Sequence, residues 1–376
     1  MGLSQNRCEV LVIGGGPAGL AAAIAMRQRG IDVLLADALI PPIDKACGEG
    51  IMPDSRRTLA LFGVNLNSTH GAFFRGITFC DDRSTATANF SSGEGIGLRR
   101  VVLHSLLVNR AREVGVRMRW GAPVTLTAGQ SPVLAGKRVT YRYLIGADGQ
   151  TSRVRTWAGL NRGTLHTRRF GFRTHYLVTP WNSNVEVHWG PYGQAYVTPV
   201  ADDEICISIV TRFPWLARTA QVIDCIPVLR EKLRCAQITS RERGSITTTR
   251  TLHRVVRGNV ALLGDASGSA DAITGEGLAM AFRQSILLAE SIKSGSLTPY
   301  AEGHSSTLRI PQSMARSLLL MDRLPAARRK VLRVFAREPL LFEKLLRVHM
   351  GEESLHRFLL EQASRFGFRM LLPSPV

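Results

Sequence analysis

Residues 9–37 read EVLVIGGGPAGLAAAIAMRQRGIDVLLAD, and this stretch decides the fold of the chain. It opens with an apolar run at 10–13, whose length and β-branched residues are typical of a buried parallel strand. A glycine-rich turn follows, then a helix of small residues, and then a second apolar run that ends at Asp37. This order of strand, turn, helix and strand predicts the first βαβ unit of a parallel sheet.

The glycines of the turn, Gly14, Gly16 and Gly19, have the spacing of a dinucleotide-binding fingerprint. The first permits a tight turn, the second lets the backbone approach a pyrophosphate, and the third lets the helix lie close on the strand. The free N–H groups and the dipole of the helix start favour phosphate charge. Asp37 is placed to accept hydrogen bonds from a ribose, which favours FAD or NAD over NADP. A purely structural turn is the alternative.

A second apolar run, within VTYRYLIGADGQTSRVR at 139–155, stops at Asp148 and Gly149. An acid at the carboxyl end of a parallel strand faces the crevice in which ligands bind. The alternative is that Asp148 only caps the helix that begins near Ser152.

A third pattern is GNVALLGDASGSADAITGEGLAMAFRQSILLAESI at 258–292. Its buried strand ends at Gly264 and Asp265, and a TGEG turn with Gly275 and Gly277 leads into a long apolar helix. Small residues and exposed N–H groups at this turn suit a second polar part of the same cofactor.

A loop of sequence CGEG at 47–50 follows two prolines that interrupt regular structure. Its glycines, Gly48 among them, would let the loop pass close to a flat ligand. Cys47 is either a reactive thiol beside a cofactor or an ordinary loop cysteine.

The pattern changes in two later parts of the chain. Alternating segments between 170 and 249 predict an antiparallel sheet, and this shift argues for a second domain inserted into the first. From residue 300 onward the chain reads as helical and basic. Its apolar stripe either packs on the main body or forms an amphipathic surface for lipid or a lipid-like substrate.

The formal net charge of +19 comes largely from scattered arginines. We find neither a basic stripe nor a motif typical of nucleic-acid binding, so we expect no nucleic-acid partner. The charge is either a compositional bias or an attraction to an anionic membrane, substrate or cofactor.

Six dispersed cysteines without a C-x-x-C pair argue against disulfides and zinc, and we expect no metal. No signal peptide is expected, because the first apolar run is the nucleotide-binding strand itself. No apolar stretch is long enough to span a bilayer. We expect a cytoplasmic protein, with peripheral membrane association as an open alternative.

Taken in this order, GGGPAG, GADGQTSRVR, and GDASG with TGEG resemble the flavoprotein family of p-hydroxybenzoate-hydroxylase-like monooxygenases and geranylgeranyl reductases. The resemblance covers about residues 8–292 and implies FAD as the cofactor. It implies an α/β fold, in which a doubly wound, Rossmann-like FAD-binding domain is interrupted by a largely antiparallel α+β substrate domain. A C-terminal helical region would follow.

On this basis we divide the chain into three parts. Residues 1–72, 96–162 and 251–300 form the FAD-binding domain, 73–95 and 163–250 the substrate domain, and 301–376 the C-terminal helical region.

The resemblance also implies roles for single residues. The pyrophosphate would lie on the first turn, Asp37 on the adenosine ribose, Asp265 on the ribityl chain, and the TGEG glycines against the isoalloxazine ring. Asp148 and Gly149 match a pair associated with both FAD and NAD(P)H. The expected cofactor-binding residues are Gly14, Gly16, Ala18, Gly19, Asp37, Gly48, Arg100, Asp148, Gly149, Gly264, Asp265, Gly275 and Gly277.

The branch of the family stays open. GDASG-x(5)-TGEG and KACGEGIMP look closer to the geranylgeranyl reductases, yet their YxWxFP motif is reduced here to Tyr196-Val-Thr-Pro. The WxWxIP motif of flavin halogenases is not found.

Our preferred hypothesis is an NAD(P)H-dependent monooxygenase that hydroxylates a hydrophobic aromatic or polyketide-like lipid substrate. The alternative is a geranylgeranyl reductase-like flavoenzyme that saturates isoprenoid double bonds. A third reading, from another class, is a non-catalytic flavin-binding or membrane- or nucleic-acid-associated basic protein. Cys47, His188 and Tyr196 are the candidate catalytic residues, and nothing in the sequence indicates an oligomeric state.

Overall fold

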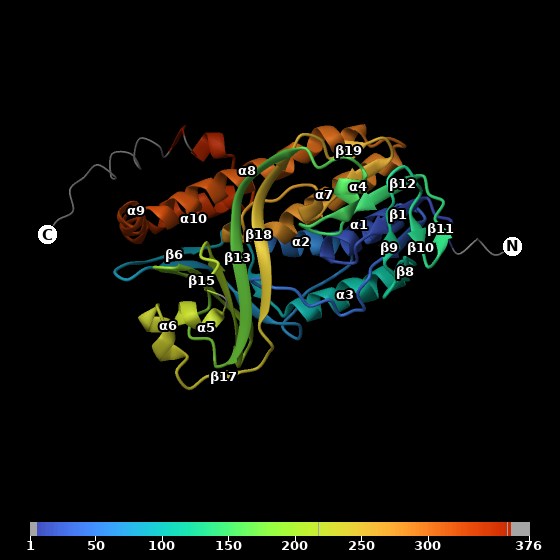
Figure 1. Ribbon diagram of the computed structural model, residues 1–376. Coiled ribbons are helices and arrows are strands. Elements are labelled where there is room, and N and C mark those ends of the chain that lie inside the picture. Colours follow the sequence, from blue (N-terminus) through green and yellow to red (C-terminus); the bar gives the residue numbers. More distant parts are fainter. Residues whose placement is uncertain (1–5, 217, 359, 362–376) are drawn as a thin grey trace.

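The computed structural model describes residues 6–216, 218–358 and 360–361, and Figure 1 shows their arrangement. A parallel sheet lies on the right of this view, and a larger mixed sheet lies beside it. The predicted α/β class with an inserted, largely antiparallel sheet and C-terminal helices is confirmed. Parts of the predicted domains, namely 1–5, 217, 359 and 362–376, lie outside the described residues.

The parallel sheet has six strands in the order β19-β20-β12-β1-β2-β8, and β19 alone of these runs antiparallel to its neighbour. Val10 of the central strand pairs with Val33 on one side and with Tyr143 on the other. The strands are β1 (Val10–Ile13), β2 (Val33–Ala36), β8 (Arg117–Arg119), β12 (Tyr143–Gly146), β19 (Val256–Arg257) and β20 (Val260–Leu262).

Side chains of β1 alternate between the two faces of this sheet, as strand geometry requires. Val10 and Val12 pack into a core with three helices, and Leu11 and Ile13 pack on the other face beneath a small sheet and a short helix. Each buried aliphatic side chain contributes about 1.5–3 kcal/mol, so both faces hold the sheet in place. The three helices are α1 (Pro17–Gln28), α3 (Arg100–Glu113) and α7 (Gly277–Lys293), and the second layer comprises β9 (Val124–Thr125), β10 (Val133–Leu134), β11 (Lys137–Arg138) and α4 (Arg153–Trp157).

Two glycines explain how closely α1 lies on β1. Gly14 has φ +112°, and a Cβ at this position would stand 2.3 Å from the carbonyl oxygen of Ala147. A Cβ at Gly19 would stand 1.9 Å from the carbonyl oxygen of Gly14. Neither position has room for a side chain, which is the physical reason for glycine at the first and third places of the turn.

The larger sheet has eight strands in the order β17-β13-β16-β15-β14-β5-β6, and β18 pairs with β13 outside this path. All neighbours are antiparallel except β14 and β5. Figure 1 shows β13 and β18 running side by side from one part of the molecule to the other. The strands are β5 (Gly76–Cys80), β6 (Thr85–Asn89), β13 (Gly163–Leu177), β14 (Val185–Gly190), β15 (Gly193–Ala201), β16 (Glu204–Thr211), β17 (Gln237–Ile238) and β18 (Arg243–Leu252).

Smaller elements complete both parts. Helices α5 (Thr219–Ile223) and α6 (Pro227–Lys232) cover one face of the larger sheet through an aliphatic core. A three-stranded sheet follows the CGEG loop, with strands β3 (Gly50–Ile51), β4 (Ala72–Phe74) and β7 (Gly95–Gly97) and the adjacent helix α2 (Pro53–Leu61).

Three C-terminal helices, α8 (Thr298–Arg323), α9 (Pro325–Arg337) and α10 (Pro339–His349), follow α7. Each of them has a proline at its first or second position, where the missing N–H costs no hydrogen bond. Phe335 of α9 stacks on Phe342 of α10, and both pack against Ala86 and Ala88 of β6. Helices α9 and α10 therefore cover one face of the edge strand β6.

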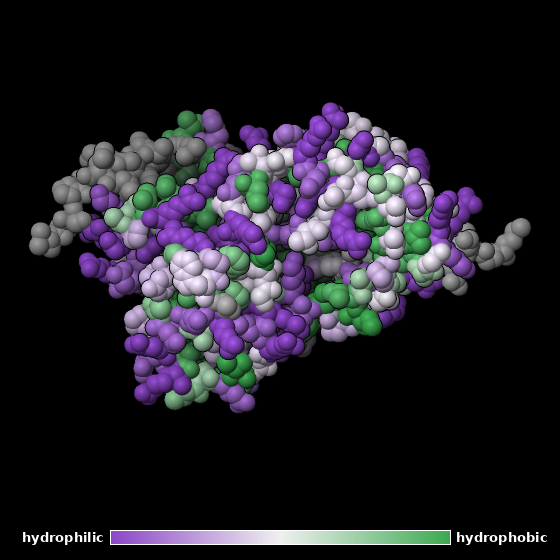
Figure 2. All heavy atoms as spheres, in the orientation of Figure 1, coloured by the Kyte–Doolittle hydropathy of each residue, from purple (hydrophilic) through white to green (hydrophobic). Residues whose placement is uncertain are grey.

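On the face drawn in Figure 2, hydrophilic residues predominate and hydrophobic ones form small separate patches. In the described part of the chain, we find no helix with both the length and the apolar character needed to cross a membrane.

Candidate functional site

A cavity of about 1090 Å³ runs from the carboxyl ends of β1, β2 and β12 to the inner face of the larger sheet and the C-terminal helices. Of the expected cofactor-binding residues, Gly19 alone does not line it, because that glycine serves the packing of α1. The others that line it are Gly14, Gly16, Ala18, Asp37, Gly48, Arg100, Asp148, Gly149, Gly264, Asp265, Gly275 and Gly277.

The first turn leaves room for a ligand above the start of α1. A Cβ at Gly16 would meet no atom within 4 Å, and no side chain caps the helix that begins beside it. The N–H groups of the first helical turn are thus available to an anion. Asp37 accepts the N–H of Gly15 at 2.6 Å and that of Leu39 at 2.7 Å. Each of its oxygens keeps a second lone pair for a ribose hydroxyl.

Asp148 has the capping role that the sequence left open as an alternative. Its carboxylate accepts the N–H groups of Arg153 at 2.7 Å and Val154 at 3.1 Å, at the start of α4. The hydroxyl of Ser152 donates to it as well. The same carboxylate borders the cavity, so capping does not remove it from the site.

A buried arginine joins the second and third glycine patterns. Arg155, which is 4% exposed, donates to the carbonyl of Gln150 at 2.8 Å and to that of Ala266 at 3.1 Å. Burial lowers the pKa of its guanidinium. This contact holds the GADG and GDASG turns beside each other, although they are more than a hundred residues apart in the sequence.

The third pattern presents an unpaired acid and an open backbone. Asp265 makes no hydrogen bond or ion pair with any part of the described chain, and its side chain borders the cavity. Gly275 has φ +70°, and a Cβ at Gly275 or at Gly277 would meet no atom within 4 Å. The start of α7 is therefore open to a flat ligand.

Arg100 brings a positive charge to the same space. Its backbone N–H donates to Glu49 at 2.9 Å, while its buried Nε has no hydrogen-bond partner among the described residues. An unpartnered guanidinium nitrogen on a residue that lines the same cavity as the starts of α1 and α7 fits an anionic, ribose-containing ligand. The residues present fit FAD.

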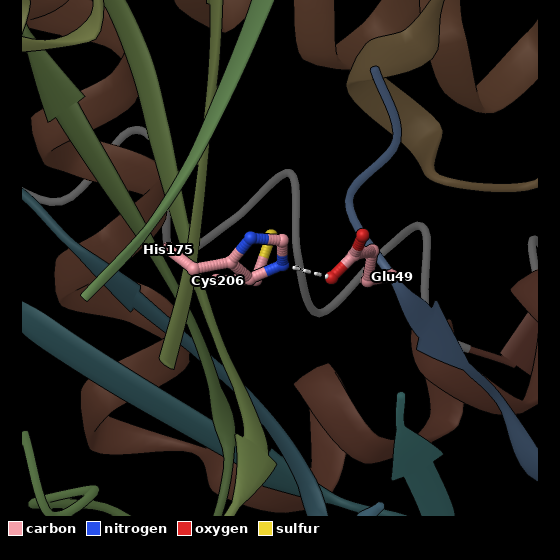
Figure 3. A group of neighbouring side chains, drawn as sticks. All are labelled: Glu49, His175 and Cys206. Carbon is pink, nitrogen blue, oxygen red and sulfur yellow. Dashed lines mark hydrogen bonds and ion pairs between the residues drawn. The ribbon is translucent and has the colours of Figure 1, made fainter. Parts of the chain in front are cut away.

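A buried cluster of side chains, shown in Figure 3, fixes the CGEG loop against the larger sheet. Glu49 has φ +60°, and its carboxylate accepts the Nε2 proton of His175 at 2.6 Å. Nδ1 of His175 faces Arg173 at 3.1 Å and the hydroxyl of Ser240 at 2.7 Å. Because arginine only donates, Nδ1 accepts and the proton lies on Nε2.

The third member of this cluster is Cys206, and the reactive atoms of Glu49, His175 and Cys206 lie within 4.8 Å of one another. That spacing would suit a metal ion. Arg173, however, places its guanidinium 3.6 Å from Glu49, and the imidazole and carboxylate already bind each other. Burial raises the pKa of the Cys206 thiol well above its ordinary value. We therefore interpret the cluster as a hydrogen-bonded clamp on the loop.

The other end of the loop is fixed in the same way. Asp44 accepts hydrogen bonds from Arg173 of β13 and from Arg243 of β18, the latter at 2.9 Å. With both ends tied to the long strands, Cys47 and Gly48 are presented to the cavity. The sequence offered no signal for this clamp, because the loop residues Asp44 and Glu49 lie more than a hundred residues before the strand residues that hold them.

The structure brings two of the three candidate catalytic residues to the cavity. Cys47 lines it, and its sulfur accepts the N–H of Glu49 at 3.4 Å. Tyr196 lines it too, but its hydroxyl donates to the carbonyl of Ile273 at 2.8 Å, and burial raises its pKa. His188 is not among the lining residues, and its Nε2 pairs with Glu186 at 2.7 Å.

The far half of the cavity is apolar. β5, β14 and all three C-terminal helices contribute to it, together with His349 at the end of α10. Its apolar lining includes Ile77, Phe79, Val187, Met314, Leu318, Met321, Val331, Phe335, Phe342, Leu345 and Leu346.

The fold and the site together define a flavoprotein, an FAD-dependent oxidoreductase. The chain belongs to the family described as FAD binding domain, which matches residues 7–294. Because an FAD-dependent oxidoreductase is an enzyme, the non-catalytic reading is set aside.

Relatives and solved structures agree with this assignment. The chain is 26% identical over 358 residues to a menaquinone reductase of Mycolicibacterium smegmatis, which covers 85% of this chain and 86% of that protein. It is 24% identical over 304 residues to digeranylgeranylglycerophospholipid reductase 2 of Methanococcoides burtonii, which covers 73% and 72%. The structure of p-nitrophenol 4-monooxygenase PnpA from Pseudomonas putida superposes with a TM-score of 0.75 at 17% identity, over 98% of this chain and 100% of that one. This last likeness concerns the fold.

Proposed function

We propose that the protein uses FAD, reduced by NAD(P)H, to saturate a carbon–carbon double bond in a substrate with a long apolar chain. The observation that carries this proposal is the continuity of the two cavity halves. A half that fits FAD opens directly into a half lined by aliphatic, methionine and aromatic side chains. The two reductases named above, which match most of the chain, also support it.

Bound FAD supplies hydride transfer. The protein binds the cofactor through the three turns and excludes water from the apolar half. Saturation of a double bond also consumes a proton, and Cys47 and His349 are among the cavity-lining side chains that can carry one.

A second candidate is the monooxygenase that the sequence favoured, acting on a hydrophobic aromatic or polyketide-like substrate. The aromatic lining supports it, because Phe342 stacks on Phe335 at 4.7 Å between ring centroids and lies 4.8 Å from Phe79. Such rings suit a flat aromatic substrate.

One experiment separates the two candidates. The FAD-loaded protein is reduced anaerobically with NADH or NADPH and then mixed with a prenyl-chain lipid. Anaerobic reoxidation of the flavin with a saturated product supports the reductase. Reoxidation only on admission of oxygen, with a hydroxylated aromatic product, would reverse the preference.

We also infer that the corner between α8 and α9 rests on an anionic lipid surface. Leu320 lines the cavity and is 56% exposed, so the apolar half reaches the surface there. Leu324 beside it is 48% exposed, and Arg323 and Lys330 are exposed nearby. Apolar side chains among basic ones fit the interface of an anionic bilayer, from which an apolar chain would enter.

A further inference from the structure

A carboxyl group and an imidazole face each other beside the cavity, in a contact separate from those of the CGEG clamp. Glu276 lies in the TGEG turn between the two cavity-lining glycines and is 1% exposed. His349 ends α10, lines the cavity and is 6% exposed. Nδ1 of the imidazole lies 3.4 Å from Oε2 of the carboxyl group.

The contact between the two groups falls short of a hydrogen bond, and no other described residue bonds to these atoms. Within the described residues, both oxygens of Glu276 and Nδ1 of His349 are buried without a hydrogen bond. A buried, unpartnered carboxylate is costly, and protonation removes that cost. Burial accordingly raises the pKa of Glu276. The remaining charged groups near it, Arg283 and Asp54, bind each other at 2.6 Å.

We propose that Glu276 and His349 hold one exchangeable proton and that His349 delivers it to the substrate in the cavity. The proposal rests on the reductase function, since saturating a double bond consumes one hydride and one proton. It makes His349 the catalytic acid and Glu276 a positioning residue that supplies its proton.

The proposed step adds one hydride and one proton across the double bond. One alkene carbon receives the hydride, which comes from reduced FAD, and the π bond breaks. The other carbon takes the proton from Nε2 of His349. The carboxyl proton of Glu276 moves to Nδ1, which leaves a neutral imidazole and a carboxylate. A proton from solvent restores the pair after product leaves.

Cys47 is one competing donor in this cavity. Its sulfur accepts the N–H of Glu49, and in the described contacts no acid stands behind the thiol to replace a proton. His349 has such an acid at 3.4 Å, which is the reason for choosing it.

The first test does not depend on turnover. Infrared spectra of the FAD-loaded full chain are compared for wild type and Glu276→Gln near neutral pH. We expect a protonated-carboxyl band in the wild type that Glu276→Gln removes. Identical spectra in this region would overturn the shared proton. Flavin absorbance of the variant establishes that it is folded and loaded, and His349→Gln, which should shift the same band, gives a second reading.

The second test measures saturated product in a single turnover of the reduced protein. His349→Asn should slow product formation by at least about 100-fold, as expected on removing a general acid. His166→Asn, at an exposed histidine, is the matched control and should leave the rate unchanged. A full rate in His349→Asn together with a lost rate in Cys47→Ser would assign the proton to the thiol instead. If wild type forms no saturated product, the proposed function fails, and the infrared band alone decides whether the pair shares a proton.

Discussion

The two halves of the cavity are built in different ways. The cofactor half consists of backbone turns at strand ends, in which glycines leave open space and a few acids point inward. The apolar half consists of side chains from β5, β14 and the three C-terminal helices, which are far apart in the sequence. Substitutions in the first half should therefore act through backbone geometry and FAD binding. Those in the second should act through packing and substrate binding.

The largest effect is expected where the cofactor half meets the core. Gly14→Ala adds a methyl group 2.3 Å from the carbonyl of Ala147 at φ +112°, and should cost at least about 3 kcal/mol of unfolding free energy. Denaturant unfolding measures this loss, and flavin absorbance of the purified protein should fall with it.

Gly16→Ala is the matched control. No atom lies within 4 Å of its added methyl group, so stability should change by less than about 0.5 kcal/mol while FAD binds more weakly. Equal stability of the two variants would contradict the assignment of Gly14 to packing and of Gly16 to ligand approach.

The next effect is expected at Glu186, a buried acid of β14 that lies between the cavity-lining Val185 and Val187. Burial opposes ionisation of Glu186, but hydrogen bonds from His188, Asn182 and Trp181 outweigh it and lower its pKa to about 2. A depressed pKa means that this stabilisation is complete above the ordinary value of 4.5 and is lost as pH falls toward 2.

Glu186→Gln removes that titration. Between pH 4.5 and 2, wild type should lose about 3 kcal/mol more unfolding free energy than the variant. Denaturant unfolding measures this difference. If the unfolding free energies of wild type and Glu186→Gln fell in parallel with pH, Glu186 would not be held ionised in the folded protein.

The cofactor half could be predicted from the sequence because each of its parts is local. A strand, a glycine turn and a helix start lie within some twenty residues, and parallel strands bring their carboxyl ends to one edge. Asp37, Asp148 and Asp265 all border the cavity. The double use of Asp148 needed the structure, because the sequence cannot tell a helix cap from a ligand-facing acid when both follow a strand.

Neither the clamp on the CGEG loop nor the contact between Glu276 and His349 could be predicted from the sequence. Periodicity indicates which face of β13 is buried, but not that His175 meets Glu49, which lies 126 residues earlier. Nor does it indicate that His349, at the end of α10, meets Glu276, at the start of α7. For His188, the sequence could not tell on which face of β14 the imidazole lies. These contacts depend on tertiary packing between distant elements.

A smaller effect is expected at Asp265, the acid of the cofactor half that has no partner among the described residues. Asp265→Asn should weaken FAD binding about tenfold, because a charged acceptor for a ligand hydroxyl is replaced by a neutral amide. Unfolding of the FAD-free protein should stay the same, since this carboxylate has no partner within the described chain. Titration with FAD, followed by flavin fluorescence, gives the affinity. An unchanged affinity would mean that the acid does not face the cofactor.

The smallest effect is expected at the corner between α8 and α9, where the apolar half of the cavity reaches the surface. A lysine near an anionic bilayer contributes about 1 kcal/mol, so Lys330→Gln should weaken binding to phosphatidylserine-containing vesicles about fivefold. Lys137→Gln, at an exposed lysine of β11 in the small sheet beside the parallel sheet, is the control with the same charge change and should bind as wild type does. Co-sedimentation with vesicles measures both. Equal losses in the two variants would mean that net charge alone drives attachment, and the corner between α8 and α9 would then have no special part in admitting the substrate.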